Sequence, residues 1–145
     1  MDDLIIHKYK DVWLVASQAE VKGGPTLDAP PVRIVPHKNK NRLKEVLLEL
    51  FSEKVPIVPR PDFNDPKQLL GIRAEALGLN SWRAFVKGAR AFYLQKMKDS
   101  LIIEEWPREK WSFVADPIWK KEYAAGELDK LIDYLIRKTT HDPES

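Results

Sequence analysis

The stretch LIIHKYKDVWLVA, residues 4–16, decides the fold class of this chain. It contains two runs rich in Ile, Val, Leu, Tyr and Trp, Leu4–Tyr9 and Val12–Ala16, with only Lys10 and Asp11 between them. Such runs are typical of β-strands, and a two-residue gap between them indicates a tight hairpin. We therefore expect the chain to begin with a pair of antiparallel strands.

A second hairpin is expected near the middle of the chain. Ala89–Lys96 and Leu101–Trp106 have the composition of strands, and residues 97–100 supply the turn between them. Val32–Val35 and Trp111–Ala115 predict two further short strands. For residues 117–119 the sequence leaves strand and loop as alternatives.

Three other segments are expected to be helices. Asn39–Glu53 carries apolar residues at helical spacing on one face, and so does Glu127–Lys138 near the end of the chain. Ser81 is placed to cap a short helix over Trp82–Lys87, and Gly88 follows it directly. We expect all three segments to pack an apolar face against the sheet.

The region between these elements is rich in proline. Prolines at positions 56, 59, 61 and 66 predict an extended loop over Val55–Pro66, and Asp65-Pro66 is typical of the start of a helix, here one running to Leu77. Strands thus occur in hairpins and do not alternate singly with helices. This order predicts an α+β fold, in which three to four helices pack on a mostly antiparallel sheet within one domain, residues 1–145. The expected core contains Trp13, Val15, Leu47, Leu50, Phe51, Trp82, Phe85, Leu131 and Leu135.

Composition and charge argue against several classes of protein. The chain has 24 basic and 22 acidic residues, a net charge of +2, whereas dedicated nucleic-acid-binding domains are usually strongly basic. It contains no cysteine, so it has no disulfide, thiolate metal site or cysteine nucleophile. No apolar run reaches the roughly 20 residues of a membrane span, and the first residues lack the features of a signal peptide. We therefore expect a cytoplasmic protein without membrane contact.

Residue spacing does not support a catalytic, metal or cofactor site. His7, His37 and His141 are far apart and lack the spacing of metal ligands, and His7 is expected at the sheet surface. Glu104 and Glu105 are neighbours in an expected strand, so their side chains would point to opposite faces. We expect no catalytic residue, metal or cofactor, and thus a binding protein instead of an enzyme. A hydrolase with a site assembled from distant residues is an alternative.

Two locally basic stretches, residues 37–44 and 82–98, leave a different function open. Aromatic residues are interleaved with the cations of the second stretch, a composition found in proteins that bind single-stranded nucleic acid. The alternative function is therefore a small nucleic-acid-binding regulator, although the near-neutral total charge disfavours it. Trp106, Trp111 and Trp119 fall within fourteen residues. Tryptophan is common in binding hot spots but also fills cores, and the core role is favoured in a domain this small.

The run from Leu77 to Arg90, LGLNSWRAFVKGAR, places Ser-Trp after a turn, Phe85 one helical turn later, and Lys-Gly-Ala before a strand. It resembles the central motif of a family of immunity proteins from bacterial contact-dependent growth inhibition (CDI) systems. The opening strand Val12–Ala16, the segment Pro30-Pro31-Val32 and the closing amphipathic helix are also similar to that family. The segment from Glu104 to Ala125 departs from the family's pattern.

The resemblance implies a cytoplasmic inhibitor that needs no cofactor and performs no reaction. Such a protein binds its cognate toxin domain, the C-terminal region of a large secreted surface protein, and nucleases are common among these toxins. A basic nuclease surface would favour an acidic patch on the inhibitor. We expect this patch in the proline-rich loop and in the segment that departs from the family. The expected partner-binding residues are Asp62, Phe63, Asp65, Glu104, Glu105, Trp106, Glu109, Trp111 and Trp119.

Overall fold

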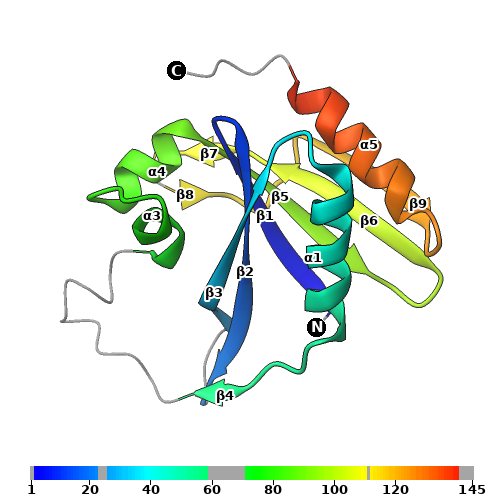
Figure 1. The fold of residues 1–145 in the computed structure, drawn as a ribbon, viewed down its shortest axis with the longest axis horizontal. Coiled ribbons are helices and arrows are strands. Elements are labelled where there is room, and N and C mark those ends of the chain that lie inside the picture. Colours follow the sequence, from blue (N-terminus) through cyan, green and yellow to red (C-terminus); the bar gives the residue numbers. More distant parts are fainter. Residues whose placement is uncertain (1, 23–25, 59–70, 111, 141–145) are drawn as a thin grey trace.

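The computed structural model describes residues 2–22, 26–58, 71–110 and 112–140. The main sheet has the strand order β3-β2-β1-β5-β6-β9 with antiparallel neighbours, and β4 pairs with β2 in parallel (Figure 1). The expected α+β fold with a mostly antiparallel sheet is confirmed. The strands are β1 (Asp3–Tyr9), β2 (Val12–Val21), β3 (Thr26–Pro36), β4 (Ile57–Val58), β5 (Ala89–Lys96), β6 (Ser100–Trp106), β7 (Arg108–Glu109), β8 (Ser112–Phe113) and β9 (Trp119–Ala124). The helices are α1 (Lys40–Ser52), α3 (Ile72–Ala76), α4 (Trp82–Gly88) and α5 (Leu128–Thr139).

Both predicted hairpins are confirmed. Tyr9 pairs with Val12, which leaves two residues in the β1–β2 turn, and the first of them, Lys10, adopts a φ of 52°. A positive φ at this position suits the primed turns whose twist matches that of paired strands. In the second hairpin, Lys96 of β5 pairs with Leu101 of β6.

The edges of the sheet differ from the sequence prediction. β3 extends over Thr26–Pro36 instead of only Val32–Val35, and it tolerates its prolines because it is an edge strand. At the other edge β9 covers Trp119–Ala124, where the sequence left residue 119 as strand or loop and predicted no strand over residues 120–124. Four of its six residues are exposed and three are charged. Of the predicted strand over Trp111–Ala115, the described residues form only β8, which pairs with β7 outside the main sheet.

The helices begin where the capping residues indicate. Asn39 Oδ1 accepts a hydrogen bond from the Arg42 backbone at 3.1 Å, and Ser81 Oγ accepts one from the Ala84 backbone at 3.2 Å. The helix expected from Asp65-Pro66 to Leu77 is described only as α3, and its expected start lies outside the described residues. None of the described helices has the length and apolarity required to cross a membrane.

Two apolar clusters lie on opposite faces of the sheet. On one face α1 and α5 pack side by side over Trp13, Phe92 and Ile103, while α3 and α4 cover part of the other face (Figure 1). The expected core residues therefore divide between two clusters, and the prediction of a buried core position is confirmed for Phe85 but wrong for Trp82. Phe85 is buried in the second cluster, and Trp82 is only partly buried at its margin, because α4 packs on the face opposite to α1.

The second face also buries two polar residues, His7, which the sequence placed at the surface, and Arg73. His7 is 4% exposed and lies against the rings of Trp82, Phe85 and Phe113. The expectation of a surface histidine is therefore wrong, because α4 and β8 cover this part of β1. Arg73 of α3 is fully buried nearby. Its guanidinium donates to Asp28 at 2.9 Å and to the backbone oxygens of Leu14 and Ile5 at 2.7 and 2.8 Å.

Candidate partner-binding site

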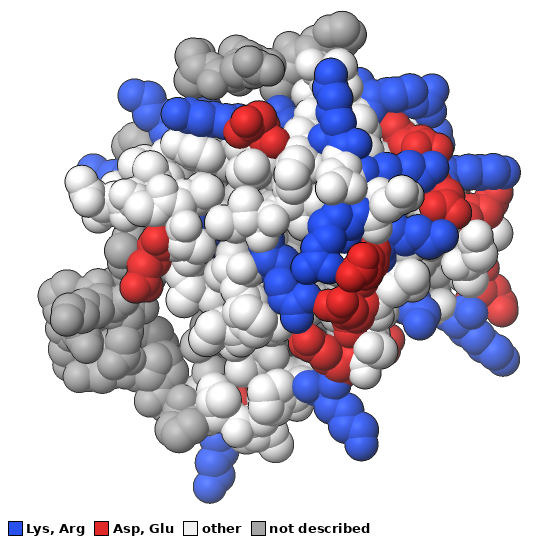
Figure 2. All heavy atoms as spheres, in the orientation of Figure 1, with Lys and Arg blue, Asp and Glu red and all other residues white. Residues whose placement is uncertain are grey.

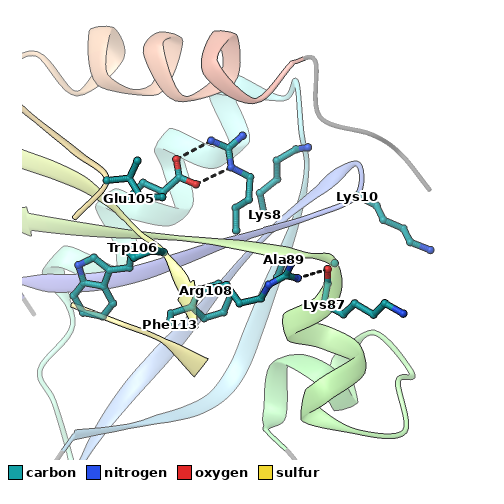
Figure 3. Close-up of a pocket in the computed structure, with 12 residues that line it drawn as sticks. Lys8, Lys10, Lys87, Ala89, Glu105, Trp106, Arg108 and Phe113 are labelled. Carbon is teal, nitrogen blue, oxygen red and sulfur yellow. Dashed lines mark hydrogen bonds and ion pairs between the residues drawn. The ribbon is translucent and has the colours of Figure 1, made fainter. Parts of the chain in front are cut away.

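A pocket of about 330 Å³ opens at the end of the sheet where β1 and β6 finish and β5 begins (Figure 3). Its position follows from register, because Lys8 of β1 pairs with Arg90 of β5 and thus brings two cations to one face. Trp106, Phe113 and Ile118 provide an apolar wall. Its charged lining residues are Lys8, Lys10, Lys87, Arg90, Arg108 and Glu105.

Positive charge dominates this pocket. Glu105 supplies the carboxylate of the lining, and the Arg90 guanidinium already binds it with two hydrogen bonds of 2.8 and 2.7 Å. Lys10, Lys87 and Arg108 have no ion-pair partner within the described ranges. In Figure 3 the side chains of Lys10 and Lys87 extend outward on the same side of the view. The pocket therefore suits an anionic group.

The C-terminal end of α4 fixes one of these cations. The Arg108 guanidinium donates to the backbone oxygen of Val86 at 3.2 Å and to that of Lys87 at 2.6 Å, the second of which is drawn in Figure 3. These oxygens belong to the last turn of α4, where the helix dipole favours cations, and Val86 O also accepts a hydrogen bond from the Ala89 backbone. The contact holds β7 against α4 and sets the position of Arg108 before any ligand arrives.

A second cationic cluster adjoins the pocket through Trp119. The Trp119 indole Nε1 donates to Glu105 Oε1 at 2.9 Å, and the ammonium of Lys138 lies 5.1 Å from the centre of the Trp119 ring. Tyr134 packs edge-on against Trp119, and the Lys121 ammonium lies 4.0 Å from the Tyr134 ring centre. Lys121, Tyr134, Arg137 and Lys138 line a shallow depression beside α5.

The acidic residues predicted to bind the partner do not converge in the described structure. Glu104 and Glu105 point to opposite faces of β6, as expected. Glu105 is only 7% exposed and paired with Arg90, so it cannot contribute to an exposed acidic patch. Glu109 is exposed in β7, and Glu104 accepts a hydrogen bond from Trp106 Nε1 at 2.8 Å. Outside the described residues lie Asp62, Phe63, Asp65 and Trp111.

The predicted tryptophans have different environments. Trp106 stacks on Tyr93 with 4.9 Å between ring centres, on the face opposite to α5, and contributes to the pocket wall. Burial, together with the carboxylates of Asp3 and Glu104, raises the pKa of Tyr93 to about 12. Trp119 is half-buried and packs against the main core beside Phe92. Both tryptophans are therefore held in place by aromatic neighbours.

The structure separates the two basic stretches that suggested nucleic-acid binding. In residues 37–44, Lys40 pairs with Asp133, Lys44 with Asp129, and Arg42 with Glu45. In residues 82–98, Lys87 and Arg90 line the pocket, whereas residues 96 and 98 lie at the far end of β5. Three cations of the first stretch are therefore ion-paired, and those of the second are divided between the two ends of β5.

Sequence reasoning missed Lys8, Lys10, Arg108, Lys121 and Lys138 as site residues. They come from four segments that are distant in the sequence, and no local spacing connects them. Cross-strand register would have been the only signal, since Lys8 and Arg90 become neighbours once β1 pairs with β5. The described residues contain no group of three or more His, Asp or Glu side chains placed to hold a metal ion.

Comparison with known proteins identifies the fold alone. No protein-family model and no curated protein sequence matches the chain. Among solved structures it is similar to a protein of unknown function, NMB0488 from Neisseria meningitidis, with a TM-score of 0.63. The match covers 94% of this chain and 91% of the other at 13% sequence identity. The two chains share an architecture.

Proposed function

We propose that this chain is an immunity protein of a contact-dependent growth inhibition system, which binds and neutralises a cognate toxin domain in the cytoplasm. One structural observation supports a binding role most directly. The strand-end pocket presents an apolar wall and two arginines, Arg90 and Arg108, whose guanidinium groups are already fixed by contacts within the chain. A surface that is ordered before association loses little conformational entropy when it binds.

The family-like motif builds one wall of this pocket. Ser81 caps α4, and Phe85 anchors the helix in the second cluster. The helix then ends at Gly88, so that Lys87 and Gly88 both line the pocket. The motif is thus structural, and it also positions a binding surface. This connection supports the proposal independently of the acidic residues that the sequence suggested.

The charge of the pocket changes the expected chemistry of the partner. An acidic inhibitor patch would suit the basic face of a nuclease, but the described pocket is cationic. We therefore expect the toxin domain to present an acidic region to this surface, beside apolar groups that contact Trp106, Phe113 and Ile118. Charged groups of this kind set partner choice and association rate more than total affinity.

The test uses the toxin domain encoded in the same locus. The intact protein should co-purify with that domain and should restore growth of cells that produce it. The double variant Lys10→Gln/Lys87→Gln should bind the domain at least about tenfold more weakly, which corresponds to about 1.4 kcal/mol. Lys96→Gln/Lys98→Gln removes the same charge at the far end of β5 and should bind normally. Failure of the wild type to bind or protect would overturn the proposal.

Nucleic-acid binding is the second candidate, supported by the aromatic residues beside the pocket cations. Its signature would be a mobility shift of single-stranded DNA that weakens steeply as salt rises, because phosphate contacts release counterions. The same pocket variant and matched control apply. A shift that the pocket variant abolishes would favour this function over immunity.

A further inference from the structure

We infer that the strand-end pocket and the cationic cluster beside α5, which contains Lys121, Arg137 and Lys138, form one recognition surface. This surface binds an acidic segment of a partner protein. This inference rests on the function proposed above, because it names the chemistry of the partner that the site would bind. The upper end of the molecule in Figure 2, where the β1–β2 turn lies in Figure 1, carries several projecting lysine and arginine side chains.

Two groups of cations keep their charge available for a ligand. In the pocket, Lys10, Lys87 and Arg108 have no carboxylate partner in the described part of the chain. Near α5, Lys121 and Lys138 contact aromatic rings, which attract an ammonium group without neutralising it. Each ammonium can therefore still donate hydrogen bonds to a carboxylate on its solvent side.

A rigid connection joins the two groups. Arg90 holds Glu105, Glu105 accepts from the Trp119 indole, and Lys138 lies over the Trp119 ring. Each contact involves a different element, β5, β6, β9 and α5 in turn. The Glu105 carboxylate pairs with Arg90 and accepts a hydrogen bond from Trp119. Its charge is thereby balanced within the protein, which reduces its repulsion of an anion that spans both groups.

The aromatic geometry favours an acidic peptide over single-stranded nucleic acid. Base binding requires open aromatic faces on which successive bases can stack. Trp119 is surrounded by Phe92, Tyr134 and Lys138, and Trp106 is stacked on Tyr93. The rings therefore support cations and form the apolar wall, while the cations remain available to meet side-chain carboxylates of a peptide.

The test measures binding of fluorescein-labelled hexaglutamate by fluorescence anisotropy at low ionic strength. Two variants remove a pair of charges each, Lys10→Gln/Lys87→Gln in the pocket and Lys121→Gln/Lys138→Gln near α5. Each should weaken peptide binding at least about fivefold. The control Lys96→Gln/Lys98→Gln should bind like the wild type. Circular dichroism and urea midpoints verify that all variants are folded.

Any one of four outcomes would overturn the inference. The wild type does not bind the peptide, the α5 variant binds it as well as the wild type does, or a labelled oligothymidylate binds more tightly than the peptide. Competition by inorganic phosphate at equal charge concentration would likewise show that the surface recognises small anions and not a segment. If the toxin domain binds but the peptide does not, the immunity proposal survives and this inference falls.

Discussion

The Arg90 guanidinium holds the Glu105 carboxylate through two parallel hydrogen bonds, Nε to Oε2 at 2.8 Å and Nη2 to Oε1 at 2.7 Å. Trp119 adds a third hydrogen bond to the same carboxylate. The Glu105 side chain is 9% exposed, whereas that of Arg90 is 27% exposed. One buried carboxylate thereby links β5, β6 and β9, and such bidentate charge-assisted pairs are the stronger and more specific ones.

The first prediction concerns this carboxylate. Glu105→Gln preserves the shape of the side chain but removes its charge, so Arg90 loses an ion pair and Trp119 a strong acceptor. Unfolding free energy should fall by about 1–3 kcal/mol, measured by urea denaturation. Glu122→Gln is the control, because Glu122 is exposed in the neighbouring strand β9. Equal midpoints for the two variants would show that the Glu105 network contributes little.

The second prediction concerns the buried arginine of α3. Arg73→Met removes the ion pair with Asp28 and leaves the backbone oxygens of Leu14 and Ile5 without these donors. The variant should lose about 3 kcal/mol of unfolding free energy, as is usual when one partner of a buried pair is removed. Arg42→Met breaks an exposed pair and should change stability little. A normal urea midpoint for Arg73→Met would contradict the structure.

The third prediction is a pH dependence that originates at His7. Burial, with the nearby charge of Arg73 as a smaller contribution, lowers the pKa of His7 well below its usual value. Its Nδ1 atom has no hydrogen-bond partner among the described residues. The folded protein therefore favours the neutral ring, while in the unfolded chain a histidine takes up a proton below about pH 6.5.

The contribution of neutral His7 to the free energy of unfolding should thus be fully present above about pH 6.5. It should decrease as the pH falls towards the pKa of His7 in the folded protein. Urea denaturation between about pH 8 and about pH 5 measures this loss. His7→Phe replaces the ring by an apolar one among Trp82, Phe85 and Phe113, and should lose less stability over the same interval. Parallel pH profiles for the variant and the wild type would refute the assignment.

The fourth prediction concerns the close approach of Gly71 and Trp82. A Cβ atom at position 71 would lie 2.7 Å from Trp82 Cε3, closer than any normal contact. Gly71→Ala should therefore destabilise the protein by about 1–3 kcal/mol, because the indole ring or α3 must move. Gly78→Ser has open space around it but a φ of 71°, so its cost would come from the backbone alone.

A double-mutant cycle separates the clash from other effects of the substitution. Trp82→Leu removes the ring that the new methyl group would meet, so Gly71→Ala should cost less in that background than in the wild type. Urea midpoints of the four proteins measure the coupling. Strict additivity would show that the two positions do not touch.

Local sequence signals were sufficient where an element is determined by its own residues. The β1–β2 and β5–β6 hairpins follow from short turns between apolar runs, and Asn39 and Ser81 cap the helices that their sequences indicate. Local signals were insufficient for β9. Its charged residues adopt a strand conformation because β6 supplies their hydrogen-bond partners. The same limit applies to Trp82, which the sequence places in the core but which lies partly buried at the margin of the second cluster.

The sequence by itself determined the α+β class, the two hairpins and the apolar faces of α1 and α5, because these depend on periodicity and turn chemistry within a few residues. Only the tertiary structure decided which face each helix covers, and hence that His7 and Arg73 are buried. It also decided the charge of the candidate site, since strand register gathers Lys8, Arg90 and Glu105 from three strands. Charge at such a site depends on long-range pairing, which no local pattern of residues encodes.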